Sequence, residues 1–83
     1  MTRAAALELG PVGIRVNGIF PSLIDTPMVA GIHGKQREEI LAKVPLGRIG
    51  HPGDVAGAAL YLSSPLSAWV SGAELVVSGA YAT

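Results

Sequence analysis

Residues 14–28, with the sequence IRVNGIFPSLIDTPM, restrict what this chain can fold into more than any other stretch. A short apolar run ends at Pro21 and Ser22, and the polar pair Asp25 and Thr26 follows just before a second proline. This order predicts a buried parallel strand that ends in a loop whose backbone is fixed by proline. Because ligands bind at the carboxyl ends of the strands in open α/β sheets, we expect a ligand-binding crevice there. The stretch does not by itself name the ligand.

Glycine and proline divide the rest of the chain into short elements. The pattern predicts, in order, a helix at Thr2–Leu9, a strand at residues 14–20, a solvated helix at residues 35–44, a helix at Pro52–Ser63 and a strand at residues 73–77. This is the order α-β-loop-α-α-β of an α/β fold, with no repeat and no linker between domains.

Four residues or segments carry more specific structural expectations. Gly10 is expected to end the first helix in a left-handed conformation, because Pro11 cannot continue the helix. Asn17 is expected to be a structural amide that bonds neighbouring backbone. The helix Pro52–Ser63 is apolar nearly all round, which predicts burial on two sides. Trp69 is expected to anchor a turn by packing between elements, with stacking on a ligand as the alternative.

Composition limits the classes of protein to which the chain can belong. Hydrophobic residues make up 49% and charged residues 14% of only 83 residues, which predicts a piece of something larger or a subunit with extensive apolar contacts. The net charge of zero gives no basic field for nucleic acid. The absence of cysteine excludes disulfides and thiolate metal sites. With no apolar run long enough for a membrane span and no signal peptide, we expect a soluble, cytoplasmic protein.

The order of the motifs resembles the C-terminal part of short-chain dehydrogenases/reductases. The resemblance rests on IRVN followed by PSLIDTPM, then on PLGRIGHPGDVA, and finally on SAWVSGAELVVSG. The ending is most similar to bacterial hydroxysteroid-dehydrogenase and ketoacyl-reductase-like members. The resemblance implies that residues 1–83 are a partial domain, the C-terminal third of a doubly wound parallel (Rossmann-like) sheet. It also implies hydride transfer between NAD or NADP and a small-molecule alcohol or ketone.

The resemblance also assigns a cofactor site. Pro21 and Ser22 match the Pro-Gly pair that lies beside the nicotinamide in the family. Ile24 matches the position whose backbone holds the carboxamide, and Thr26 matches the hydroxyl residue that bonds the carboxamide or the pyrophosphate. Residues 27–46 correspond to the variable substrate lid.

The resemblance further implies a homo-oligomer, a dimer or tetramer, formed through the helix at residues 52–63 and the strand at residues 73–77. Two departures from the family pattern stand out. Ser22 replaces the usual glycine, so its backbone is less free to adopt a positive φ. Ser78-Gly79-Ala80 replaces the usual Asp-Gly-Gly. This departure concerns one structural hydrogen bond near the C-terminus, which the chain is not expected to keep in the usual form.

Two motifs of the family do not occur in the sequence. There is no glycine-rich dinucleotide turn, and there is no Tyr-x-x-x-Lys, because Pro65 follows four residues after Tyr61. We therefore assign no catalytic residue to this chain and expect the last third of an oxidoreductase that is inactive alone. The alternative is a non-catalytic remnant that acts, if at all, through self-association.

Other polar residues have weaker functional interpretations. His33 and His51 are expected to be loop histidines rather than metal ligands, because neither has an evident partner. Asp25 has the chemistry of a catalytic base, but the resemblance makes it a variable loop residue. Ser71 and Ser78 have no nearby base that would make them nucleophiles.

Overall fold

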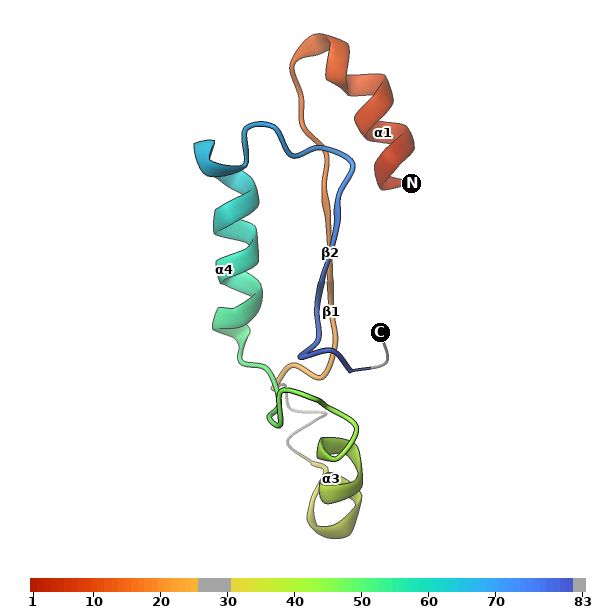
Figure 1. Cartoon of the computed structure of the whole chain (residues 1–83), viewed down its shortest axis with the longest axis vertical. Helices are drawn as coiled ribbons and strands as arrows, with labels where there is room; N and C mark the ends of the chain where they lie inside the picture. Colours follow the sequence, from red (N-terminus) through yellow and green to blue (C-terminus); the bar gives the residue numbers. More distant parts are fainter. Residues whose placement is uncertain (26–30, 82–83) are drawn as a thin grey trace.

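The structure, a computed structural model, describes residues 1–25 and 31–81. Its elements are α1 (Thr2–Leu9), η1 (Gly10–Val12), β1 (Gly18–Pro21), α3 (Gly34–Leu41), α4 (Pro52–Ser63), η2 (Pro65–Ser67) and β2 (Glu74–Val77). The molecule is elongated, with extents of 51 × 21 × 20 Å. In Figure 1 the two strands run along its middle, α4 runs beside them, and α1 and α3 lie near opposite ends.

The two strands form a parallel sheet. Gly18 pairs with Glu74, and the register continues to Pro21 opposite Val77. A parallel pair needs a crossover connection, and here α4 is part of it. This arrangement confirms the predicted α/β class with a parallel sheet.

Strand β1 begins later than the predicted residues 14–20. The backbone N–H of Val16 donates to the hydroxyl of Ser71 at 3.1 Å, so a side chain takes the place of a ladder carbonyl. The carbonyl of Val16 accepts from the N–H of Gly72 at 2.7 Å. The predicted start of the strand was therefore wrong by four residues, because a serine hydroxyl takes the N–H of Val16 in place of a ladder carbonyl.

Asn17 has the structural role predicted for it. Its Nδ2 donates to the carbonyl of Val70 at 3.0 Å, and its Oδ1 accepts from the N–H of Ala73 at 3.0 Å. The amide thus joins the start of β1 to the turn that leads into β2.

The end of α1 differs from the prediction in its geometry. Gly10 has φ −53°, in the right-handed region, and it begins a 3-10 turn that ends at Val12. The left-handed residue is Gly13, with φ 82°. Pro11 is compatible with this turn because its fixed φ suits a first helical turn. The prediction of a left-handed Gly10 was therefore wrong.

Helix α4 has the predicted bounds, with Pro52 at its first position. The prediction that it is buried on two sides was wrong, because none of its residues is buried and Leu60 is 72% exposed. The helix lies along the strands on one side, and nothing in the described part of the chain covers its other side (Figure 1). Trp69 is 99% exposed, so the prediction that it packs between elements was also wrong.

Burial is concentrated in very few side chains. Among the described residues, Val44 and Ile49 are the buried hydrophobic ones, and the polar residues Ser67 and Ser78 are buried with them. Most large apolar side chains of the two strands and of α4 remain exposed. The described part of the chain therefore presents apolar surface that it does not cover itself.

Candidate active-site edge

The carboxyl ends of β1 and β2 meet at one edge of the sheet. Pro21 is the last residue of β1, and the N–H of Ser22 donates to the carbonyl of Val77 at 3.0 Å. This bond extends the pairing one residue beyond β1, so the loop that follows is tied to the end of β2. Of the predicted cofactor residues, Pro21, Ser22 and Ile24 lie together here. Thr26 lies outside the residues that the structure describes.

The loop at residues 22–25 turns at Leu23, not at Ser22. Leu23 has φ 52°, and among the described non-glycine residues it shares a positive φ only with Ala80. The left-handed region is unfavourable for a residue with a side chain. The replacement of glycine by Ser22 therefore places no left-handed strain on Ser22, and the unusual backbone falls one residue later.

A second contact, which was not predicted from the sequence, holds this loop. Ile24 forms an isolated parallel bridge with Gly50. The N–H of Gly50 donates to the carbonyl of Leu23 at 2.9 Å, and the N–H of Asp25 donates to the carbonyl of Gly50 at 2.7 Å. No local pattern could have revealed the pair, because the partners are far apart in the chain.

An open hollow of about 390 Å³ lies at this edge. Its lining residues include Ser22 and the apolar residues Ile24, Leu75 and Val76. The remaining lining residues are Leu46, Arg48, Gly50, Asp54, Val77, Ser78, Gly79 and Ala80. A wall that combines apolar side chains with polar groups is compatible with a flat, uncharged ring that carries an amide, such as a nicotinamide. The residues present therefore fit this half of a dinucleotide.

An ion pair borders the hollow at the start of α4. Nη1 of Arg48 lies 2.9 Å from Oδ2 of Asp54, and Nη2 lies 3.2 Å from Oδ1. Oδ2 also accepts from the N–H of His51 at 2.7 Å, which satisfies one of the free donors at the helix start. The hydrogen bond from Arg48, followed by that from His51, lowers the pKa of Asp54 to about 2. The carboxylate is therefore charged at neutral pH.

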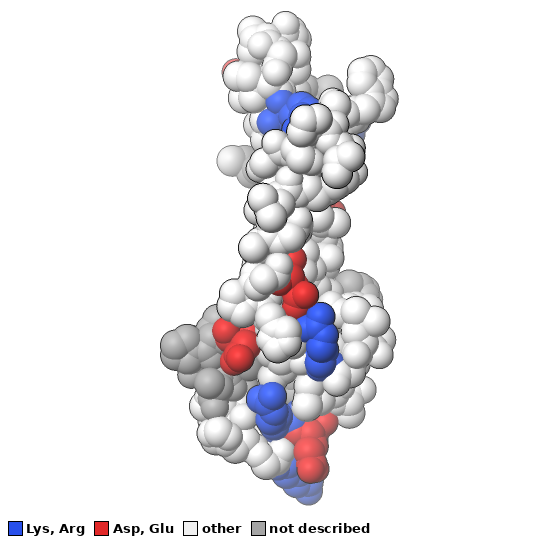
Figure 2. Space-filling view, turned by 90° about the vertical axis from the view of Figure 1, so that its left-hand side faces the viewer, with Lys and Arg blue, Asp and Glu red and all other residues white. Residues whose placement is uncertain are grey.

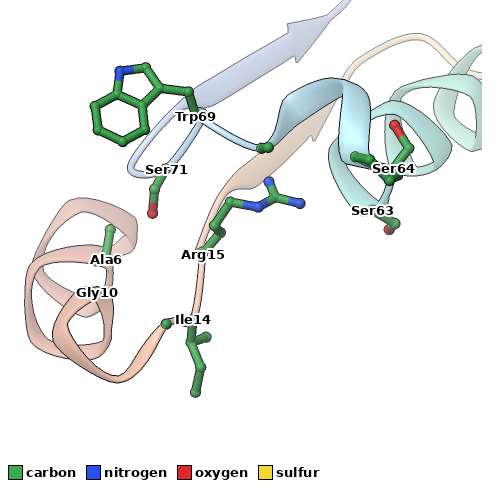
Figure 3. A pocket seen from close by; sticks show the side chains of 11 residues that line it. Ala6, Gly10, Ile14, Arg15, Ser63, Ser64, Trp69 and Ser71 are labelled. Carbon is green, nitrogen blue, oxygen red and sulfur yellow. The ribbon is translucent and has the colours of Figure 1, made fainter.

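A larger hollow of about 790 Å³ lies at the opposite end of the strands. It is lined by residues before β1, by the end of α4 and by the turn before β2. In Figure 3, Arg15 reaches toward the end of α4 and the indole of Trp69 stands apart. Because this hollow is at the amino ends of the strands, its size does not make it the ligand site expected of a parallel sheet.

The other candidate groups form no cluster. Asp25 is exposed, and its backbone rather than its carboxylate makes the contact with Gly50. Within residues 1–25 and 31–81, no three His, Cys, Asp or Glu side chains are placed to hold a metal ion. Among the helices that the structure describes, none combines the length and apolar character needed to cross a membrane.

Comparisons with known proteins concern the family and the fold of the chain. The sequence model of the family described as enoyl-(acyl carrier protein) reductase matches residues 1–82. Cis-4-hydroxycyclohexanecarboxylate dehydrogenase from Sinomonas cyclohexanicum is 42% identical over 81 residues, which are 98% of this chain and 32% of that protein. 3alpha-hydroxysteroid dehydrogenase from Mediterraneibacter gnavus is 41% identical over 80 residues, 96% of this chain and 32% of that protein.

Solved structures share the fold. A 3-oxoacyl-[acyl-carrier protein] reductase from Brucella melitensis has a TM-score of 0.93 at 41% identity, covering 99% of this chain and 31% of that one. A 7α-hydroxysteroid dehydrogenase complexed with NADH and 7-oxo glycochenodeoxycholic acid has a TM-score of 0.87 at 42% identity, covering 96% of this chain and 32% of that one.

A parallel α/β sheet with a candidate site at its carboxyl edge is the architecture of the nucleotide-binding oxidoreductases. The chain belongs to the family whose model matches it, and it is a member of the short-chain dehydrogenases/reductases. This confirms the resemblance seen in the motifs. The chain spans about a third of the length of the relatives described above.

Proposed function

We propose that the chain forms the nicotinamide side of an oxidoreductase that transfers a hydride between NAD or NADP and a small-molecule alcohol or ketone. The observation that carries the proposal is the meeting of Pro21, Ser22 and Ile24 beside the hollow at the carboxyl edge of the sheet. The names of the relatives support it, since they are dehydrogenases and reductases, and one is described in complex with NADH.

The bound dinucleotide would supply or accept the hydride at its nicotinamide ring. This chain's part is to hold that ring. The backbone of Ile24 is proposed to bond the carboxamide, and Pro21 limits the freedom of the backbone that leads to it. Thr26 is proposed to add a hydroxyl donor to the carboxamide or the pyrophosphate. The general acid and the phosphate-binding turn are assigned to a part of the enzyme outside these 83 residues.

The test joins residues 1–83 to the preceding part of the 7α-hydroxysteroid dehydrogenase described above; we call this protein the completed enzyme. We expect it to bind NADH or NADPH and to reduce a 7-oxo bile acid, because the two parts together supply all the groups named. The preceding part alone serves as the control, and the 83-residue chain alone should not turn over. A well-folded completed enzyme that binds neither cofactor would contradict the proposal, as would turnover by the chain alone.

Exposed apolar surface favours a second role, association between copies. Leu60 is 72%, Leu66 83% and Val76 53% exposed. Figure 2, which views the molecule from the α4 side, shows charged side chains gathered toward the α3 end and few over α4. A large uncovered apolar surface typically marks an interface. We therefore propose a homo-oligomer through α4 and β2, and self-association of the isolated chain.

Sedimentation velocity of the chain alone tests this proposal. Leu60→Glu places a charge on the apolar surface and should shift the chain toward monomer. Lys35→Glu changes the charge on exposed α3 and is the matched control. A monomeric, well-folded parent chain would overturn the proposal of association.

A further inference from the structure

We infer that Gly50 is a positioning residue for the proposed nicotinamide site. With Leu23, Ile24 and Asp25 it forms a small unit, here called the clasp, that joins the loop after β1 to the start of α4. The inference rests on the proposed function, because it concerns the loop to which that function assigns the carboxamide.

The first argument is the backbone of Leu23. A residue with a side chain persists at φ 52° only where its surroundings hold it there. The N–H of Gly50 reaches the carbonyl of Leu23 at 2.9 Å, and the return bond from Asp25 to Gly50 is 2.7 Å. Ile24 lies between these two bonds, so its own backbone direction is fixed by them. A ligand that bonds the backbone of Ile24 would find it already oriented.

The second argument is the close approach of the two segments. A Cβ at position 50 would lie 2.8 Å from Cδ1 of Ile24 and 3.5 Å from Oδ2 of Asp54. The first distance is shorter than carbon atoms tolerate, so the side chain of Ile24 would have to move within the hollow that it lines. Because Cδ1 is the far end of a flexible side chain, alanine can be accommodated at position 50, but only by a shift of Ile24.

The third argument is topological. The bridge between Ile24 and Gly50 joins two points that are 26 positions apart in the sequence, one just after β1 and the other just before α4. Gly50 is followed directly by His51, whose N–H bonds Asp54 at the start of α4. The clasp thus fixes the loop after β1 to the start of α4.

Two substitutions in the completed enzyme separate these effects. Gly50→Pro removes the N–H that bonds Leu23. Gly50→Ala keeps both backbone bonds and adds only the contact with Ile24. Ile24→Val removes Cδ1 and should relieve that contact in the double variant. Gly57→Ala, in α4, is the matched control, because a Cβ there meets nothing within 4 Å.

The readouts are the affinity for NADH, the affinity for ADP-ribose, which lacks the nicotinamide, and the hydrogen exchange of the Asp25 amide. We expect Gly50→Pro to raise the Kd for NADH roughly 3- to 10-fold, the loss of about one hydrogen bond. The Kd for ADP-ribose should not change, and the Asp25 amide should exchange faster. Gly50→Ala should raise the Kd for NADH by a smaller factor. The double variant Gly50→Ala/Ile24→Val should return the Kd toward that of the unsubstituted enzyme.

The alternative outcomes are distinct. Equal weakening of NADH and ADP-ribose, or no change in either, would overturn the positioning role. If Gly50→Pro does not fold, the pair Gly50→Ala and Gly50→Ala/Ile24→Val decides by the same comparison. If the unsubstituted completed enzyme binds neither ligand, the proposed function fails. Exchange of the Asp25 amide then still shows whether Gly50 holds the loop.

Discussion

Nη1 of Arg15 donates to Oγ of Ser67 at 3.1 Å, although the two residues are 52 positions apart in the sequence. The same guanidinium donates to the carbonyls of Val70 at 3.1 Å and Leu62 at 2.9 Å. Ser67 is fully buried, and its hydroxyl donates a hydrogen bond to the carbonyl of Ser64 at 3.1 Å. One side chain thereby ties the approach to β1 to the end of α4 and to η2.

This contact predicts that Ser67→Ala lowers the free energy of unfolding of the completed enzyme by about 1–2 kcal/mol, because it removes the two hydrogen bonds of the buried Ser67 hydroxyl, one from Arg15 and one to the carbonyl of Ser64. Arg15→Lys should cost at least as much, since an ammonium lacks the fork that reaches three acceptors. Urea unfolding measures both changes. Ser63→Ala, an exposed serine nearby, is the control; equal effects at Ser63 and Ser67 would contradict the assigned role.

Ala80 predicts a stabilising change. It has φ 71°, where a Cβ is unfavourable. Ala80→Gly should therefore raise the free energy of unfolding by about 1 kcal/mol. The same change within a helix, Ala59→Gly, should lower it by about 1 kcal/mol. Opposite signs in thermal or urea unfolding support the assigned backbone, and a loss at both positions would refute it.

The sequence predicted the local elements better than the contacts between them. The alanine run of α1 and Pro52 at the start of α4 are local signals, and both helices have the predicted bounds. Burial of Trp69 was predicted wrongly, because the size of a side chain does not show whether this chain supplies a surface to cover it. The clasp at Gly50 was missed because its partners are brought together only by the sheet.

The candidate site was predictable in part for the same reason. A strand that ends at Pro21 places Ser22 and Ile24 at a carboxyl edge by the rules of parallel sheets alone. The left-handed backbone was expected to concern Ser22 and was found at Leu23. That one-residue difference depends on two hydrogen bonds, one from the N–H of Gly50 to Leu23 and one from the N–H of Ser22 to Val77. Gly50 and Val77 lie outside residues 14–28, so the pattern of that stretch could not predict these bonds.

Asp54 predicts a particular acid dependence. Its pKa in the folded chain is about 2, below the ordinary value of 3.8, so it contributes stability that is fully present above about pH 4. That contribution is lost as the pH falls from 3.8 through about 2. The stability difference between the parent and Asp54→Asn should therefore be constant near neutral pH and shrink in this acid range. Glu38→Gln is the control; a constant difference down to pH 2 would be inconsistent with the ion pair.

Thr26 gives a prediction that rests on the motif alone. Thr26→Val keeps the shape of the side chain and removes its hydroxyl donor. The Kd of the completed enzyme for NADH or NADPH should rise roughly 3- to 100-fold, depending on whether the lost bond went to a neutral or a charged group. Fluorescence titration measures the change, with Thr2→Val as the control. Unchanged affinity for both cofactors would make Thr26 an ordinary loop residue.

The long separation between the paired strands has a consequence for the order of folding. Asn17 and Ala73, which join the two strand starts, are 56 positions apart. At about 5–20 residues per second, a ribosome needs roughly 3–11 s to make that distance. Helix α4 and the bond from the N–H of His51 to Asp54 join residues that are close in the sequence, so they can form within this interval. Strand β1 cannot pair with β2 until β2 has been made. We expect pulse-labelling to show the amides of α4 protected before those that join β1 to β2.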